Sequence, residues 1–258
     1  MRLLPVAFAS LLAIAASLPA YAGTFMLRTT DGVDISAESW GSGSHGVVLI
    51  HADGDDRTGW ADFAATLAQN DFRVVAVDLR GHGRSGGTIA EDDYPKMVAD
   101  VAAAVTWLDG KGVKDVGLVG AELGANLALA ALAADPDVDT AVMLSPSLSA
   151  HGVRVSSALD KIGRRPVLLV ASKLDSSGSR AAGLIEGKAT GPKHLALYDG
   201  TAAGRKMLNT APELEGLMVS WLNGTFLQAS DSRAASHAEV DTEVEEIETT
   251  GERFEDKH

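Results

Sequence analysis

The sequence contains no cysteine, few aromatic residues and no excess of basic residues. The absence of cysteine excludes disulfide bonds, thiolate catalysis and cysteine-bound metal ions. Lys and Arg number 22 against 35 Asp and Glu, which gives a formal net charge of −13. Because nucleic-acid binding requires a basic surface, we expect no nucleic-acid partner. Aromatic residues make up 5% of the chain, so the sequence gives no sign of a large aromatic-lined pocket.

Long apolar runs are also absent except at the N-terminus, where residues 1–22 have the pattern of a signal peptide. Arg2 precedes a mostly apolar stretch over residues 3–18, and Ala20-Tyr21-Ala22 offers the small residues that a signal peptidase reads. An uncleaved anchor is disfavoured because the apolar stretch is short and interrupted by proline and serine. We therefore expect a periplasmic or secreted protein that begins at Gly23 and does not span a membrane after cleavage.

The C-terminal segment has few apolar residues. Residues 229–258 hold ten acidic and three basic side chains, together with many Ser, Thr and Ala. Such a composition buries too little apolar surface to offset the entropy of ordering. We expect an acidic disordered tail over residues 229–258 that follows one domain over residues 23–228.

Strand-like and helix-like patterns alternate along residues 24–226. Asp31-Gly32 is a strong hairpin signal between the first two strands. The expected strands cover residues 24–30, 33–40, 46–51, 72–78, 115–120, 140–144, 166–171 and 194–198. The expected helices cover residues 58–69 with Thr58 as N-cap, 94–108, 125–134, 179–186 and 211–222. This alternation predicts an α/β fold, with a mostly parallel twisted sheet, an antiparallel N-terminal hairpin and helices on both faces.

The stretch Gly120-Ala121-Glu122-Leu123-Gly124 joins one of these strands to an Ala- and Leu-rich helix. A strand, a sharp turn and a helix form the setting of the G-x-S-x-G nucleophile elbow. Both glycines are present, but Glu122 stands where the nucleophilic serine belongs.

A second motif follows the strand expected at residues 72–78. Residues 78–85 read Asp-Leu-Arg-Gly-His-Gly-Arg-Ser, a glycine-rich loop placed at the expected distance before the elbow. With these two motifs, residues 24–226 resemble the α/β-hydrolase superfamily, as a cap-less member similar to serine hydrolases. Residues 145–165 are too few for a lid domain. The resemblance implies an oxyanion hole formed by the backbone N–H groups of Ala52 and Leu123.

The same resemblance implies a degenerate catalytic triad. Asp175 matches the triad acid, but Ala203 occupies the position of the catalytic histidine in the loop over residues 200–204. None of the seven histidines lies where the elbow expects its base. His51 is the nearest candidate, although for His51 and His82 we favour a structural role, hydrogen-bonded to the backbone.

Glu122 is expected to lie at a helix N-terminus, which favours a negative charge. We expect Arg205 or Lys206 to support it as an ion-pair partner, because both follow directly on the loop that holds Ala203. An alternative interpretation places a Ca²⁺ ion among loop carboxylates at the ends of three strands, namely Asp53, Asp55, Asp56, Glu122 and Asp175. We favour solvated loop acids and expect neither metal nor cofactor.

Three functions remain open. The first is a catalytically impaired hydrolase that binds a small molecule or a protein partner in its open cleft. The second is an active hydrolase of esters or related acyl substrates with an unorthodox site. The third is a structural or interaction protein that acts through its acidic tail.

Overall fold

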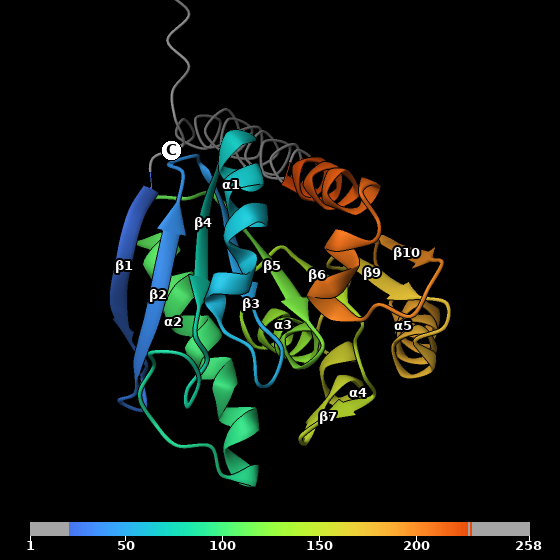
Figure 1. The fold of residues 1–258 in the computed structure, drawn as a ribbon, viewed down its shortest axis with the longest axis horizontal. Helices are drawn as coiled ribbons and strands as arrows, with labels where there is room; N and C mark the ends of the chain where they lie inside the picture. Colours follow the sequence, from blue (N-terminus) through green and yellow to red (C-terminus); the bar gives the residue numbers. More distant parts are fainter. Residues whose placement is uncertain (1–20, 227, 229–258) are drawn as a thin grey trace, which may run out of the picture.

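The computed structural model describes residues 21–226 and residue 228 (Figure 1). The acidic tail and all but the last two residues of the expected signal peptide lie outside the described residues. Within the described part of the chain, no helix is long and apolar enough to cross a membrane.

The core is an eight-stranded sheet in the order β1-β2-β4-β3-β5-β6-β9-β10. Strands β1 and β2 pair antiparallel, as do β2 and β4, and the remaining neighbours pair in parallel. The predicted fold class is therefore confirmed, with the antiparallel hairpin at one edge. The strands are β1 Tyr21–Arg28, β2 Asp34–Trp40, β3 His45–Ile50, β4 Phe72–Val77, β5 Asp115–Ala121, β6 Thr140–Leu144, β9 Val167–Ser172 and β10 Lys193–Tyr198.

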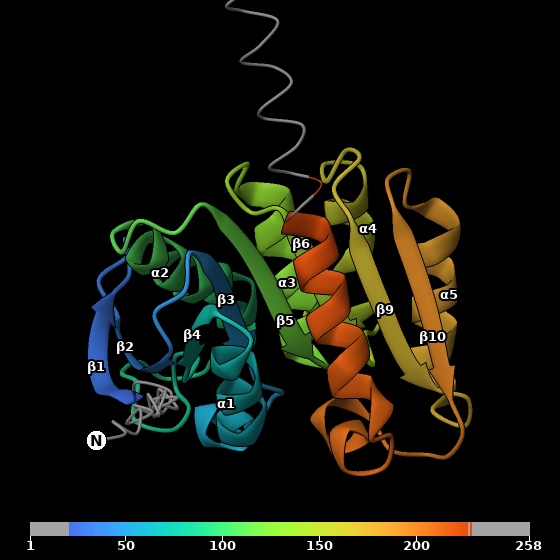
Figure 2. The ribbon, with the colours of Figure 1, turned by 90° about the horizontal axis from the view of Figure 1, so that it is seen from above.

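Helices cover both faces of the sheet (Figure 2). Alternate residues of the buried strand β5 face opposite clusters: Val116 and Leu118 pack with α2, α3 and α5, whereas Val119 packs with α1 and the last helix. Burying such side chains on both faces supplies roughly 1.5–3 kcal/mol each and explains why the central strands read as continuous apolar runs. The helices are α1 Ala61–Gln69, α2 Val98–Asp109, α3 Leu123–Ala134, α4 Val155–Leu159, α5 Ser176–Lys188 and a last helix over residues 213–226.

The first helix differs from its prediction at the N-terminal end. The 3-10 turn η1 (Arg57–Trp60) precedes α1, and the N-cap is Asp56 rather than Thr58. The carboxylate of Asp56 accepts the N–H of Thr58 at 2.8 Å. Asp56 has the extended backbone that a cap needs, and its side-chain oxygen reaches the N–H of Thr58. The 3-10 turn therefore begins at Arg57, two residues earlier than a helix capped by Thr58 would begin.

A small hairpin that was not predicted lies between β6 and β9. Strands β7 (Ser149–Ala150) and β8 (Val153–Arg154) pair antiparallel, and α4 follows directly. The turn consists of His151 and Gly152, which both have positive φ, 45° and 81°. As expected, no lid domain forms here, but the hairpin carries His151 to the end of the sheet where β5 ends.

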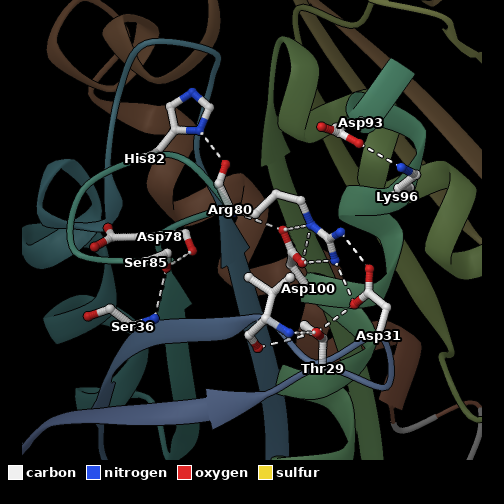
Figure 3. Close-up of polar contacts among 11 residues, drawn as sticks. Thr29, Asp31, Ser36, Asp78, Arg80, His82, Ser85, Asp93, Lys96 and Asp100 are labelled. Carbon is white, nitrogen blue, oxygen red and sulfur yellow. Dashed lines mark hydrogen bonds and ion pairs between the residues drawn. The ribbon is translucent and has the colours of Figure 1, made fainter. Parts of the chain in front are cut away.

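The glycine-rich loop after β4 is fixed by buried charges. Arg80 reaches Asp100 of α2 at 2.7 Å and Asp31 of the β1–β2 turn at 2.6 Å, as Figure 3 shows. Asp100 is fully buried, and its burial raises the pKa of its carboxyl, against the effect of the hydrogen bonds from Arg80. For Asp31, the hydrogen bonds from Arg80 and from Thr29 hold the pKa well below its usual range.

Asp78 anchors the other side of this loop. Its carboxylate accepts the N–H groups of Arg57 and Arg84 and pairs with the guanidinium of Arg57. Ser85 donates to the Asp78 carbonyl at 2.6 Å and accepts the N–H of Ser36 at 2.8 Å (Figure 3). The motif thus ties β4 to its neighbour β2 and supports the end of the sheet where the elbow lies.

Candidate active-site cleft

The turn between β5 and α3 has the geometry of a nucleophile elbow. Glu122 adopts φ 52° and ψ −108°, a conformation that side-chain-bearing residues rarely take. A Cβ at Gly120 would lie 2.0 Å from the carbonyl oxygen of Gly124, and a Cβ at Gly124 would lie 2.3 Å from that of Ile50. Both glycines are therefore required by the tight approach of the helix to the strands.

The carboxylate of Glu122 is exposed and has no side-chain hydrogen bond or ion pair with any of the residues that the structure describes. It does not cap α3, although it occupies the N-cap position. It lies instead against Gly204: a Cβ added there would be 2.7 Å from Oε1 of Glu122. Glu122 therefore fills space beside the loop in which the resemblance placed a histidine.

The expected ion pair between Glu122 and Arg205 does not form. The guanidinium of Arg205 contacts Asp55 at 3.0 Å and covers Gly59, where a Cβ would lie 2.4 Å from Cζ. The side chain of Lys206 is exposed and pairs with no carboxylate of the described residues. The chain turns at Gly204, which has φ 53°, immediately before Arg205.

Glu122, Asp175 and Ala203 all line one open cleft of about 390 Å³. Leu123, whose N–H would serve the oxyanion hole, lines it as well, whereas Ala52 does not and Asp53 takes its place. Asp175 caps α5 by accepting the N–H of Gly178 at 3.0 Å and the hydroxyl of Ser177 at 3.0 Å. Four serines complete the polar part of the wall: Ser145, Ser147, Ser149 and Ser177.

The histidine of the cleft is His151, which the sequence did not single out. Its Nε2 lies 3.4 Å from Oδ2 of Asp53, and its ring stacks on Tyr94 at 4.1 Å between ring centroids. Asp53 also accepts the hydroxyl of Tyr94 at 3.3 Å, with His82 Nε2 3.1 Å away. An imidazole held by a carboxylate thus stands in the same cleft as Glu122, from the β7–β8 hairpin rather than the loop after β10.

His51 lies behind the cleft and is engaged by the backbone. Its Nδ1 donates to the Ala52 carbonyl at 2.6 Å, which leaves Nε2 to accept the N–H of Leu79 at 2.9 Å. The side chain is buried, and this burial lowers its pKa from the usual 6.5. Of the two roles considered from the sequence, the contacts of His51 match the structural one.

Because folded His51 resists protonation and the unfolded chain does not, acid should destabilise the fold through this residue. The contribution of neutral His51 to the free energy of unfolding is complete above pH 6.5. It is lost as the pH falls toward the lower pKa of the folded state, at up to about 1.4 kcal/mol per pH unit. We expect His51→Gln to show a shallower decline in the free energy of unfolding between about pH 7 and pH 5, measured by urea denaturation. His194→Gln, at an exposed site on β10, is the control and should keep the wild-type slope. An unchanged slope in His51→Gln would contradict the assignment.

The loop carboxylates do not converge as a calcium site would require. Asp55 is engaged by Arg205, Asp56 caps η1 and Asp175 caps α5. Within the described residues, no three His, Asp or Glu side chains are placed to hold one metal ion.

Known proteins resemble this chain in sequence. A family model for the alpha/beta hydrolase fold matches residues 47–165. A protein of Mycobacterium tuberculosis described as uncharacterized is 28% identical over 221 residues, which are 79% of this chain and 63% of that protein. A bifunctional esterase/perhydrolase of Acinetobacter calcoaceticus is 38% identical over 95 residues, 35% of this chain and 33% of that enzyme. This chain therefore spans less than two thirds of the length of these curated relatives.

Solved structures resemble it in fold. An esterase from Pyrococcus furiosus superposes with a TM-score of 0.68 at 20% identity, over 80% of this chain and 91% of that one. An esterase from Exiguobacterium antarcticum superposes with a TM-score of 0.66 at 18% identity, over 78% of this chain and 99% of that one.

Proposed function

We propose that this chain, which belongs to the α/β-hydrolase superfamily, is an exported, catalytically impaired hydrolase that binds a ligand in its open cleft. The observation that carries the proposal is that two replacements occur together: Glu122 stands at the elbow and Ala203 at the histidine position, and both line one cleft. Export follows from the pattern of residues 1–22.

The chemical argument concerns the second half of an acyl-transfer reaction. Some hydrolases of this fold use a carboxylate nucleophile, but a base must then activate water to release the ester intermediate. Ala203 supplies none. Glu122 also reaches one methylene further than an aspartate, and a displacement of about 1 Å costs roughly 100-fold in rate. Nucleophile and base are thus both altered.

The test is a screen of esters, thioesters and amides with the full chain. We expect turnover at the level of the uncatalysed reaction, unchanged by Glu122→Ala because no covalent step depends on that carboxylate. Glu213→Gln, which changes an exposed acid outside the cleft, is the matched control for folding and purity. Turnover that Glu122→Ala abolishes and Glu213→Gln preserves would overturn the proposal.

A second candidate, an active hydrolase with an unorthodox site, is favoured by one observation, the His151–Asp53 pair in the cleft. In that case water would attack the acyl carbon while His151 takes its proton, and the same proton would pass to the leaving alkoxide, giving an acid and an alcohol. Turnover lost in both His151→Phe and Asp53→Asn, but retained in Glu122→Ala, would identify this route. No contact among the described residues bears on a role for the acidic tail.

A further inference from the structure

We propose that the ligand of this cleft is a small, extended organic cation that carries separated ammonium groups. The inference rests on the proposed ligand-binding function and specifies the chemical class of the ligand.

The first argument is the charge of the wall. Asp53, Glu122 and Asp175 line the cleft, and no Lys or Arg among residues 21–226 does. A concave surface lined by charge of one sign raises the local concentration of ligands of the opposite sign and repels those of the same sign. The carboxylate products of ester hydrolysis would therefore be disfavoured in the cleft, whereas an amine would be attracted.

The second argument is that no Lys or Arg of the described residues pairs with these carboxylates, while Asp53 contacts His151 and His82 and Asp175 caps α5. The guanidinium of Arg205 is held by Asp55, and Lys173 pairs with Asp199 at 2.7 Å. Glu122, at the centre of the elbow, has no ion-pair partner among the described residues. A cationic ligand would supply the partner that the expected Glu122–Arg205 pair does not provide.

The third argument is the shape of the cleft, which separates an organic cation from a metal ion. At about 390 Å³ the cleft has the size of small-molecule sites, which range from about 300 to 1,000 Å³. Its three carboxylates come from different loops, and no three acidic or histidine side chains of the described residues are close enough to share one ion. Carboxylates that line one cleft from different loops, rather than as one group that could hold a metal ion, match a chain with separated ammonium groups. The serine hydroxyls of the wall can accept further N–H groups.

Calorimetric titration of the full chain with three ligands of equal length tests the inference. Butane-1,4-diamine, butane-1,4-diol and butanedioate differ in charge but hardly in size. We expect the diamine to bind at least about tenfold more tightly than the diol, and butanedioate not to bind. Binding of the diamine should weaken as the NaCl concentration rises, because exposed charges are screened.

Variants locate the binding site. Glu122→Gln keeps the shape of the side chain and removes its charge, and we expect it to weaken diamine binding by about threefold to tenfold. Glu213→Gln makes the same change outside the cleft and should bind as the wild type does. No heat with the diamine, equal affinity for the diol, or equal affinity in Glu122→Gln would each overturn the inference. The outcomes are separable: ester turnover dependent on Glu122 would refute the impaired-hydrolase proposal, while the diamine titration decides the charge class of the ligand.

Discussion

The double variant Glu122→Ser/Ala203→His should hydrolyse a chromogenic ester such as p-nitrophenyl acetate at least about 100-fold faster than the wild type and either single variant. The gain requires both changes because a nucleophile and its base act as one unit, with strongly non-additive effects. The elbow already holds residue 122 in the strained conformation that a nucleophile needs. Ala203 has an extended backbone that accepts any side chain, and it lines the cleft together with Asp175.

The control for this experiment is the triad acid. Adding Asp175→Asn to the double variant should remove most of the gain, since a carboxylate must orient and stabilise the new imidazole. Because Asp175 also caps α5, the thermal unfolding of each variant must be measured, and only folded variants compared. A folded double variant with no more activity than the wild type would contradict the view that these two positions account for the loss of catalysis.

Removing the buried guanidinium of Arg80 should cause the largest loss of stability. We expect Arg80→Met to lower the free energy of unfolding by about 3–5 kcal/mol, because it leaves the fully buried Asp100 without its cation. The side chains of Arg80 and Asp100 are 5% and 0% exposed, so solvent cannot replace the lost contact. Urea denaturation followed by tryptophan fluorescence measures the change.

Arg28→Met is the matched control, since it breaks an arginine–aspartate contact at the surface. The side chains of Arg28 and Asp34 are 64% and 56% exposed, and such pairs contribute about 1 kcal/mol or less. Equal losses in the two variants would show that the Arg80 network is not a principal support of the fold.

The fold could be predicted from the sequence because its signals are repetitive and local. Apolar runs marked the central strands within one or two residues, and the Asp31-Gly32 turn marked the antiparallel edge. The glycines of the elbow were recognised as part of a motif, and the structure shows that backbone approaches each of them too closely for a side chain. Prediction failed at boundaries where a single side chain decides, as where Asp56 rather than Thr58 caps the first helical turn.

The residues that line the cleft were harder to predict from the sequence. Two strands of two residues each leave no periodic pattern, so hydrophobic periodicity could not indicate that the β7–β8 hairpin would carry His151 to the cleft. Proximity in the sequence was misleading for Arg205, because its guanidinium pairs with Asp55 rather than with Glu122. The dipeptide His151-Gly152 was the one sequence signal that could have marked the hairpin turn, because glycine, and to a lesser degree histidine, tolerates the positive φ that both residues adopt.

The close contact between Glu122 and Gly204 has a consequence for how this site can vary. Because Oε1 of Glu122 lies 2.7 Å from where a side chain at residue 204 would begin, the carboxylate would have to turn aside for any residue other than glycine, and φ 53° at residue 204 favours glycine as well. Among homologous sequences, an acidic elbow should therefore occur together with a glycine at this loop position.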